Sequence, residues 1–461
     1  MSFMPPTDSM FLLAESREHP MHVGGLQLFE LPDGAGPDIV TELIETFRAT
    51  DNISPTFRKR PAEPVSSLGN TWWKYDDTID YDHHIRHSAV PKPGRIRELL
   101  QLTSRWHGAL LDRHRPLWEA HVVEGLADGR IAVYSKIHHS LVDGVAAIRL
   151  MNRSLTEDPD ARDCMPPWSL PPRKGKGPRD GDGGFDPLGV LRGVGEAAGE
   201  VAGLLPASAK IVSQIIRDGD ITLPSAPKTI LNGRVGGARR FAAQSWEIDR
   251  IKRVAKSSAT TLNDVVLAMV SGALREYLLE QHALPDEPMS AMVPISLALR
   301  AESAGKDAGE SNSVGAIVVN LATDRENGAT RLEEIAYSSR TSKKLLGGLT
   351  QNQILAFSAL QVLPLAMTQV PGFLRYTRPP FNVIVSNVPG PKNQMYFNGA
   401  RLDGMYPVSI VLDGQAINIT LCSRDNYLDF GIIGCRKSVP HLQRLLTHLE
   451  TSLAELETAW G

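Results

Sequence analysis

The sequence predicts a mixed α/β protein built from two units of similar size that are separated by a long connector. Strand-like alternation and helical runs occur over residues 1–165 and again over 240–461. Between them, residues 166–184 consist largely of Pro, Gly, Lys, Arg and Asp, which bury too little apolar surface to order a chain. We therefore expect an N-terminal domain over 1–165, a connector over 166–239 and a C-terminal domain over 240–461.

The composition limits the classes of partner and compartment. The 49 basic and 52 acidic side chains give a formal charge of −3 without a long basic run, so we expect no nucleic-acid partner. The three cysteines, Cys164, Cys422 and Cys435, show no CxxC spacing, which argues against a disulfide framework and against a zinc site. Residues 1–9 lack the basic stretch and apolar run of a secretory signal, and we therefore expect a cytoplasmic protein.

Helix and strand patterns alternate through the first unit. Residues 8–15 predict a short helix, and residues 21–29 predict a strand. Residues 118–124 alternate at period two, Asp128-Gly129 is typical of a hairpin turn, and residues 131–137 are the returning strand. The residues that follow 137 therefore lie where a buried strand ends.

The connector continues as a helical, apolar segment with few charges over residues 187–217. Its apolar face can pack across the two domains, which we favour, or lie on a membrane or lipid-droplet surface. Residues 354–370 are also apolar, but Ser358 and other polar residues leave them short of the roughly 20 apolar residues of a membrane span. We expect a buried or lipid-contacting helix there, and peripheral contact of the protein with the inner membrane or a lipid inclusion.

The second unit contains one long helix and a series of strands. Thr261 and Asp264 fit an N-terminal capping pattern, and the apolar run after them predicts a helix to about residue 280. The other elements are predicted strands at 290–296, 381–385, 405–412, 416–423 and 427–433 and a closing helix over 440–459.

The most informative motif directly follows the predicted strand 131–137. His138 and His139 are followed by Asp143 and Gly144, and the carboxylate lies four positions after the second histidine. An imidazole can accept a proton near neutral pH, so this short loop is a candidate general-base site.

A purely structural interpretation of the motif is also open. Asp143 could be only the cap of the helix that follows, and paired histidines can be core residues. A second pair, His83-His84, has no Asp-Gly at the required distance, and we interpret it as a strand or strand edge without a catalytic role. The strand before His139 and the helix pattern after it favour the catalytic interpretation.

The spacing His-His-x-x-x-Asp-Gly resembles the signature of acyltransferases with the chloramphenicol-acetyltransferase-like fold. With three further elements in order, the chain resembles the bacterial wax ester synthase/diacylglycerol acyltransferase family over nearly its whole length. These elements are Pro116-Leu117-Trp118, Asn263-Asp264 and Ser386-Asn387 before Val-Pro-Gly-Pro, and residues 20–25, 418–421 and 429–431 also look similar. One departure is Ser311-Asn312, where the family usually has Gly-Asn.

The resemblance implies two chloramphenicol-acetyltransferase-like domains with a channel between them. It implies transfer of a fatty acyl group from acyl-CoA to a long-chain alcohol or a diacylglycerol in storage-lipid synthesis, without a metal or prosthetic group. His139 lies at the position of the family's catalytic base, and His138 shapes the loop. We expect Asp143 to hold the loop and the imidazole tautomer, and Gly144 to allow close passage of the backbone.

The other motif residues divide into structural and supporting roles. We interpret Pro116-Leu117-Trp118 as the entry to a strand with a core tryptophan, and Asp264 as a capping residue. Asn263 is open between turn chemistry, support of the histidine loop and substrate contact. The Ser386-Asn387 pair at a strand end could donate hydrogen bonds to a thioester oxygen or to the pantetheine arm.

Two other functions use the same motif. A condensation domain of a peptide assembly line would be expected to carry further modules, and we expect none here; a non-catalytic lipid-binding protein would keep the motif without activity. No serine or cysteine lies in a nucleophile-elbow pattern, and Ser140 has no base placed for it. We therefore expect direct transfer without a covalent acyl-enzyme.

Overall fold

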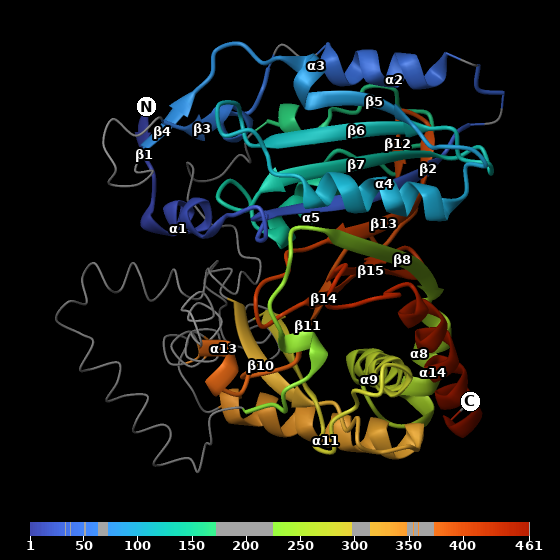
Figure 1. Ribbon diagram of the computed structural model, residues 1–461. Helices are drawn as coiled ribbons and strands as arrows, with labels where there is room; N and C mark the ends of the chain where they lie inside the picture. Colours follow the sequence, from blue (N-terminus) through green and yellow to red (C-terminus); the bar gives the residue numbers. More distant parts are fainter. Residues whose placement is uncertain are drawn as a thin grey trace.

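The structure is a computed structural model. It describes residues 1–62 except 33, 37, 50 and 51, together with 72–171, 225–296, 314–347, 354, 358 and 373–460. The predicted helix at 187–217, most of 354–370, the Ser311-Asn312 pair and connector residues 172–184 lie outside the described residues. Two lobes are stacked on one another, with the N-terminus on the upper lobe and the C-terminus on the lower one (Figure 1).

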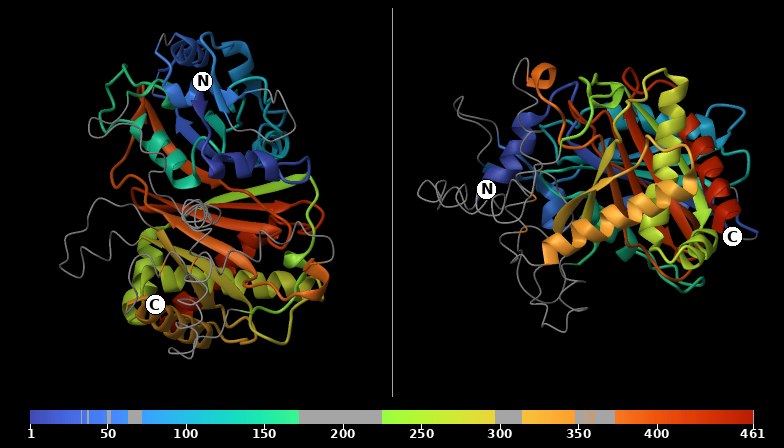
Figure 2. Two further views of the ribbon diagram at one scale, coloured as in Figure 1. Left: turned by 90° about the vertical axis from the view of Figure 1, so that its left-hand side faces the viewer. Right: turned by 90° about the horizontal axis from the view of Figure 1, so that it is seen from below.

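The upper lobe is built on a six-stranded sheet in the order β12-β13-β2-β7-β6-β5. Only the β5–β6 pair among these neighbours is parallel. The strands are β2 (His22–Glu30), β5 (Ile85–Ala89), β6 (Trp118–Glu124), β7 (Ile131–His138), β12 (Tyr396–Phe397) and β13 (Ala400–Val408). The last two come from the C-terminal part of the chain, and Figure 2 shows their orange and red ribbons next to the blue and cyan strands. The upper lobe is therefore completed by residues far away in sequence.

Both faces of this sheet are covered by helices. Successive side chains of a strand point to opposite faces, so each strand contributes to two apolar clusters. On β7, Ile131, Val133 and Ile137 join an apolar cluster with α2 (Ile39–Arg48) and α5 (Gly144–Arg153). Ala132 and Tyr134 join another cluster with α4 (Ile96–Gly108) on the opposite face.

The lower lobe has a second six-stranded sheet, in the order β10-β9-β11-β14-β15-β8. Its strands are β8 (Arg239–Glu247), β9 (Ser290–Ser296), β10 (Val314–Asn320), β11 (Val383–Val388), β14 (Ile417–Arg424) and β15 (Tyr427–Cys435). Its helices are α8 (Ile248–Ser257), α9 (Leu262–Glu280), α11 (Gly328–Gly347) and α14 (Arg444–Trp460). The apolar α9 packs against α14, α11 and α8, and so forms the centre of this lobe.

Smaller elements lie at the edges of the two sheets. A three-stranded sheet joins β1 (Ser2–Phe3), β4 (Trp72–Tyr75) and β3 (Lys59–Pro61). The remaining helices are α1 (Pro6–Ala14), α3 (Tyr81–His84) and α13 (Phe373–Tyr376), with short 3-10 turns at Pro55–Arg58, Pro167–Ser169 and Ile230–Asn232.

The structure confirms the mixed α/β class and corrects several boundaries. The strand expected at 405–412 is β13 and ends at Val408, because residues 409–416 cross from the upper sheet to the lower one. The closing helix begins at Arg444 rather than at 440. His83 and His84 end a short helix rather than a strand, because the side chain of Asp80 caps it by accepting the N–H of His83.

Candidate active site

The loop that carries the two histidines is held at one end by a backbone hydrogen bond and at the other by a helix cap. His138 is the last residue of β7 and lies opposite His22 of β2. The N–H of His139 donates to the carbonyl of Met21 at 2.8 Å. The Asp143 side chain accepts the N–H of Ala146 at 2.8 Å and caps α5, which is the contact that the structural interpretation of this residue expects.

The His139 ring lies between α1 and a cavity. It is 4% exposed and stacks on Phe11, with the ring centres 4.3 Å apart and the ring planes 17° apart. On its other side it lines a cavity between the lobes that spans about 840 Å³, including space open to solvent. The stacking contact and the backbone bond together fix the imidazole at the wall of this cavity.

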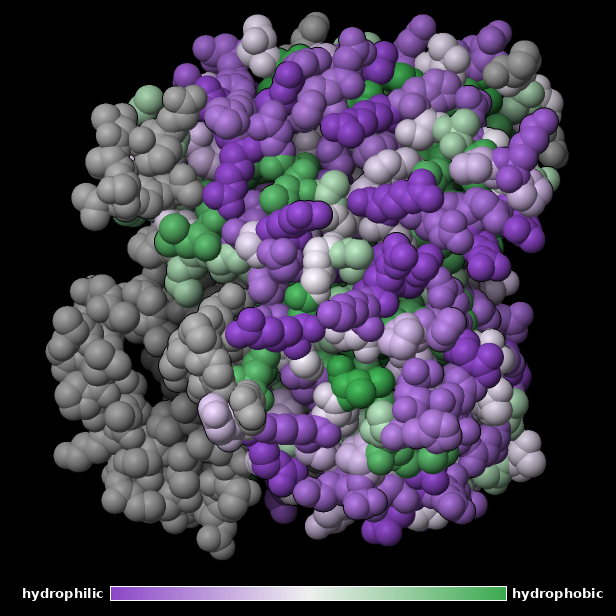
Figure 3. Space-filling view, viewed as in Figure 1, coloured by the Kyte–Doolittle hydropathy of each residue, from purple (hydrophilic) through white to green (hydrophobic). Residues whose placement is uncertain are grey.

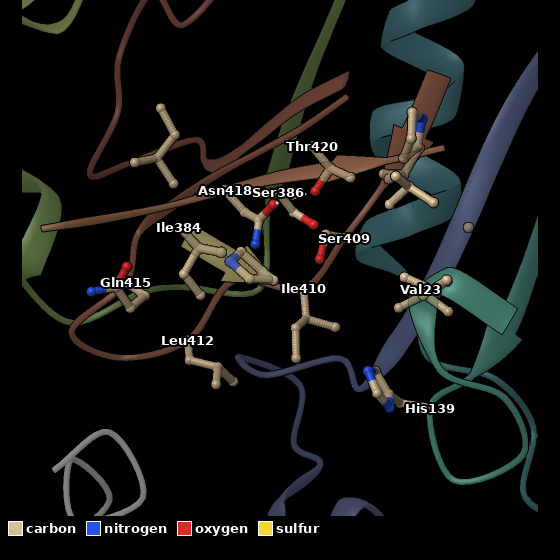
Figure 4. A pocket seen from close by; sticks show the side chains of 18 residues that line it. Val23, His139, Ile384, Ser386, Ser409, Ile410, Leu412, Gln415, Asn418 and Thr420 are labelled. Carbon is tan, nitrogen blue, oxygen red and sulfur yellow. Dashed lines mark hydrogen bonds between the residues drawn. The ribbon is translucent and has the colours of Figure 1, made fainter. Parts of the chain in front are cut away.

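Walls of the cavity come from both sheets (Figure 4). Val23 lies on the His139 side, whereas Ile384 and the crossover residues Ser409, Ile410 and Leu412 belong to the other side. Gly144 and Ile417 also line the cavity. Among the described lining residues, none is Lys, Arg, Asp or Glu. The cavity therefore suits a neutral, mainly apolar ligand.

A group of polar side chains faces His139 across this cavity. Ser386, Ser409, Asn418 and Thr420 line it, and Figure 4 shows their polar atoms on the far side from the imidazole. The Thr420 hydroxyl donates to Oδ1 of Asn418 at 2.8 Å, so the Asn418 amide group is left as a donor. In Figure 4 its nitrogen points into the cavity.

Behind the loop, His138 is tied to a buried carboxylate. The N–H of Ser140 donates to Nδ1 of His138 at 3.1 Å, which places the proton of the neutral ring on Nε2, 3.3 Å from Glu15 Oε1. Burial lowers the pKa of His138, and the Glu15 carboxylate opposes part of that shift. Its lowered pKa keeps His138 as a neutral ring behind the loop.

Glu15 is also paired with an arginine. Its side chain is 2% exposed, and Oε2 accepts hydrogen bonds from Nη2 and Nε of Arg113 at 2.9 and 3.1 Å. Burial raises the pKa of Glu15, but hydrogen bonds and charge from His138 and Arg113 outweigh it and hold that pKa below its ordinary value. Glu15 therefore remains ionised, with the Arg113 guanidinium on one side and the His138 ring on the other.

The structure brings only part of the predicted set to the cavity. Ser386 lines it from β11, but Asn387 is exposed, because neighbouring residues of a strand point to opposite faces. The pair also lies within β11 rather than after the strand. Gly144 lines the cavity, yet an added Cβ would meet nothing closer than Val23 at 3.9 Å, so close backbone passage does not explain this glycine.

The remaining motif residues are away from the cavity. Asn263 lies in the first turn of α9, where the Thr261 and Asp264 side chains bond reciprocally to each other's backbone. Leu117 and Trp118 are fully buried, and Trp118 donates from its indole to the Phe57 carbonyl at 2.8 Å. Structural roles for Asp264 and Trp118 are therefore supported.

Sequence reasoning missed Glu15, Ser409 and the role of Asn418 and Thr420. Glu15 is separated from His138 by more than a hundred residues, and nothing local indicates that they meet. The polar pair Asn418 and Thr420 carried a usable signal, because two polar residues at period two interrupt one face of an otherwise apolar strand.

A buried histidine connects the α4 face to the cavity wall. His107 Nε2 donates to the Ser409 carbonyl at 2.9 Å, and its Nδ1 lies 2.8 Å from the Tyr134 hydroxyl. This contact joins the upper lobe to the crossover that lines the cavity. Burial lowers the pKa of His107 to about 3.

Acid is expected to destabilise the fold as the pH falls from about 6.5 towards 4. Burial lowers the pKa of His84 to about 4 and of His107 to about 3, compared with 6.5 for an ordinary histidine. Below pH 6.5 the unfolded chain therefore binds protons that the folded protein does not bind, so the free energy of unfolding decreases as the pH falls. Urea unfolding across this range should show the decrease, and His107→Gln should reduce its slope. Equal stability across the range would contradict the expectation.

No group of three or more His, Cys, Asp or Glu side chains with the arrangement of a metal site occurs in the part of the chain that the structure describes. A search of the same residues finds no helix with the length and apolar character needed to cross a membrane.

Comparisons with known proteins point to one family over nearly the whole chain. The profile of the wax ester synthase/diacylglycerol acyltransferase catalytic domain matches residues 4–266, and that of the family's C-terminal domain matches residues 310–457. A Mycobacterium tuberculosis protein named as a diacylglycerol O-acyltransferase is 53% identical over 463 residues, covering 100% of both chains. The O-acyltransferase WSD of Acinetobacter baylyi is 41% identical, covering 98% of this chain and 96% of its own.

Solved structures show the same fold. The wax ester synthase/diacylglycerol acyltransferase from Marinobacter aquaeolei VT8 has a TM-score of 0.79 at 39% identity, covering 100% of both chains. The first condensation domain of the calcium-dependent antibiotic synthetase has a TM-score of 0.57 at 18% identity, covering 99% of this chain and 95% of its own, which shows a shared fold alone. The expected two-domain fold is confirmed, and the chain belongs to the wax ester synthase/diacylglycerol acyltransferase family of O-acyltransferases.

Proposed function

We propose that this protein transfers a fatty acyl group from acyl-CoA to the hydroxyl of a long-chain alcohol or of a diacylglycerol, for the synthesis of storage lipid. The observation that carries the proposal is the position of His139. Its imidazole is fixed at the wall of a cavity whose described lining has no Lys, Arg, Asp or Glu, and hydrogen-bond donors face it from the opposite wall.

His139 acts as the general base in this proposal. A hydroxyl is a weak nucleophile near pH 7, whereas a thioester is already activated, so the reaction needs removal of the hydroxyl proton. The imidazolium formed in this step then protonates the departing CoA thiolate. No metal or prosthetic group takes part in these steps.

Developing negative charge on the thioester oxygen requires donors at the other wall. The Asn418 amide and the Ser386 hydroxyl are the groups that we assign to this role. Asn387 is exposed, so we assign the donor role that was expected for it to Asn418 instead.

The uncharged walls favour this reaction over the use of a peptide substrate. Walls formed by Val23, Ile384 and Ile417 offer apolar contact to a hydrocarbon chain and no partner for an ionised group. The high identity to whole-length acyltransferases supports the same choice, whereas the likeness to condensation domains is one of fold. A protein that only binds lipid would not need donors and a base on facing walls.

We also propose that the protein works in peripheral contact with a membrane or a lipid inclusion, where such acceptors are dissolved. Large apolar side chains are exposed close to the N-terminus, and the space-filling view shows a hydrophobic patch beside α1 (Figure 3). The exposed residues here are Met1, Phe3, Met10, Leu13 and Trp72. Contact through this edge would place the enzyme next to its acceptor.

The test uses purified protein and measures release of the CoA thiol. Acyl-CoA is supplied with a fatty alcohol, with a diacylglycerol, or with neither, and a carrier-bound aminoacyl substrate is tested in parallel. We expect thiol release only when an alcohol or a diacylglycerol is present, with the matching ester as product. Turnover of the aminoacyl substrate alone would favour a condensation reaction, and no turnover at all would favour lipid binding.

Direct transfer predicts a kinetic pattern. Because acyl-CoA and acceptor must occupy the cavity together, initial-rate plots at varied concentrations of both substrates should intersect. Parallel lines, or an acylated protein isolated after mixing with acyl-CoA alone, would indicate a ping-pong route through a covalent intermediate.

A further inference from the structure

One face of β2 leads from the active-site cavity into the upper lobe. Alternate residues of a strand share a face, so Val23, Gly25, Gln27 and Phe29 follow one another on the side covered by α2 and α5. Val23 lines the active-site cavity, whereas Gln27 and Phe29 line a second cavity of about 410 Å³. The second cavity therefore lies further along the same sheet face.

A third cavity lies beside the second. It spans about 270 Å³, including space open to solvent, and shares Ser135, Pro167 and Trp168 with its neighbour. Its remaining lining includes Ile137 and Ala147, which lie on β7 and α5 close to the histidine loop. The two cavities are therefore neighbours between the sheet and the helices above it, with Ser135, Pro167 and Trp168 common to both.

Small residues keep the floor of this space open. Gly25 is paired with Ser135 across the β2–β7 ladder, so two of the smallest residues lie side by side on the sheet. Among the residues that the structure describes, the Met151 side chain covers Gly25, with its Sδ and Cε atoms 2.6 and 2.7 Å from the position of an added Cβ. Met151 therefore lies above the strip that separates Val23 from Gln27.

Methionine is suited to a gate at this point. Its unbranched side chain has three rotatable bonds and repacks at low cost. Met151 is 1% exposed and also lines the third cavity, into which rotation can carry its thioether. Movement of this one side chain would join the cavity at His139 to the two cavities behind it.

Trp168 sets the size of the space. It lines both inner cavities and is held by stacking on Trp118, at 4.9 Å and 22°, and by an edge contact with Phe47 at 5.3 Å. Its indole also donates to the Phe47 carbonyl at 3.3 Å. A wall that is fixed in this way cannot move aside for a longer ligand.

We propose that this space is a tunnel for a long saturated hydrocarbon chain of a substrate, with Met151 as its gate next to His139 and Trp168 as the wall that limits chain length. The inference deepens the proposed function and rests on it for the identity of the substrates. A mainly apolar lining on the same face of β2 as Val23 supports a hydrocarbon occupant, although Gln27, Ser135, Ser154 and Glu119 also belong to it. The chain can belong to the acyl donor or to the alcohol, and the experiment separates these two sources.

The test compares Trp168→Leu, which enlarges the tunnel, with Ser135→Leu, which fills it. In one arm a series of saturated acyl-CoAs of increasing length is used with one fixed alcohol, and in the other a series of alcohols is used with one fixed acyl-CoA. Since each methylene in an apolar pocket changes kcat/KM by about tenfold or more, Trp168→Leu should favour the longest chains by at least that factor. Ser135→Leu should shift the preference towards short chains. The arm in which the shift occurs identifies the chain that the tunnel binds.

Trp246→Leu is the matched control, because Trp246 is equally buried but belongs to the lower-lobe core. It should lower stability without changing either length profile. Trp168→Phe replaces Trp168→Leu if the larger change prevents folding. Wild-type length profiles in both arms for the enlarging and the filling variants would overturn the tunnel.

Equilibrium binding of the same acyl-CoAs and alcohols, each measured alone by calorimetry, gives a readout that does not depend on turnover. If the wild-type protein binds these ligands but transfers no acyl group, the proposed function fails, whereas the length dependence of binding still decides the tunnel. A length preference in binding that the two variants shift in opposite directions supports it. Unchanged preferences overturn it.

Discussion

His139→Ala is expected to lower the rate of thiol release by about 100- to 10,000-fold, which is the usual contribution of a general base. The imidazole lines the cavity between the lobes and stacks on Phe11, but the loop itself is held by backbone hydrogen bonds and by the Asp143 cap. The fold should therefore persist in the variant. Thiol release with acyl-CoA and a fatty alcohol measures the rate, and thermal melting followed by circular dichroism confirms folding.

His84→Ala is the matched control for this prediction. His84 is also fully buried and stacked on an aromatic ring, Trp118, at 4.5 Å, but it does not line the cavity. We expect the control to lose stability and to keep its activity at temperatures where it is folded. A folded His139→Ala protein with wild-type thiol release would show that the base has been assigned to the wrong residue.

Glu15→Gln is expected to lower kcat by about 100-fold, because small displacements of a catalytic group have effects of that size. The change removes the charge that joins His138 to Arg113 and leaves buried donors poorly satisfied. It should also lower the free energy of unfolding by about 1–3 kcal/mol. Steady-state kinetics and urea unfolding measure the two effects.

Glu15 acts through His138 and is therefore a positioning residue, so kcat should change more than KM. Glu18→Gln, an exposed change on the same segment, should leave both parameters as in the wild type. If folded Glu15→Gln protein kept wild-type kcat while losing stability, Glu15 would have a structural role only.

Local features of the site could be predicted from the sequence. The alternation of 118–124 and 131–137 around Asp128-Gly129 predicted the β6–β7 hairpin, and the Asp143 and Thr261 caps follow from side chains that bond to nearby backbone. These features depend on residues within a few positions of one another, which is the range over which sequence patterns have a direct physical meaning.

Contacts between distant segments could not be predicted in this way. Nothing near Glu15 indicates that it meets His138, because that contact depends on how α1 lies across the end of β7. Ser386 and Asn387 lie within β11 rather than after it. If the pair is placed within the strand, its opposite directions are predictable, because neighbouring residues of a strand point to opposite faces. Assignment of the strand end therefore decided whether this part of the site was predicted correctly.

The origin of β13 has a consequence for the order in which the chain acquires its structure during synthesis. Gly25 of β2 lies opposite Pro407 in the β2–β13 ladder, so the upper sheet lacks a strand until residues 400–408 have left the ribosome. Until then, β2 is an open edge with unpaired backbone groups, which is a surface prone to pairing with other chains. The nascent N-terminal half must therefore remain incomplete for most of translation, and its final folding is coupled to the arrival of the C-terminal half.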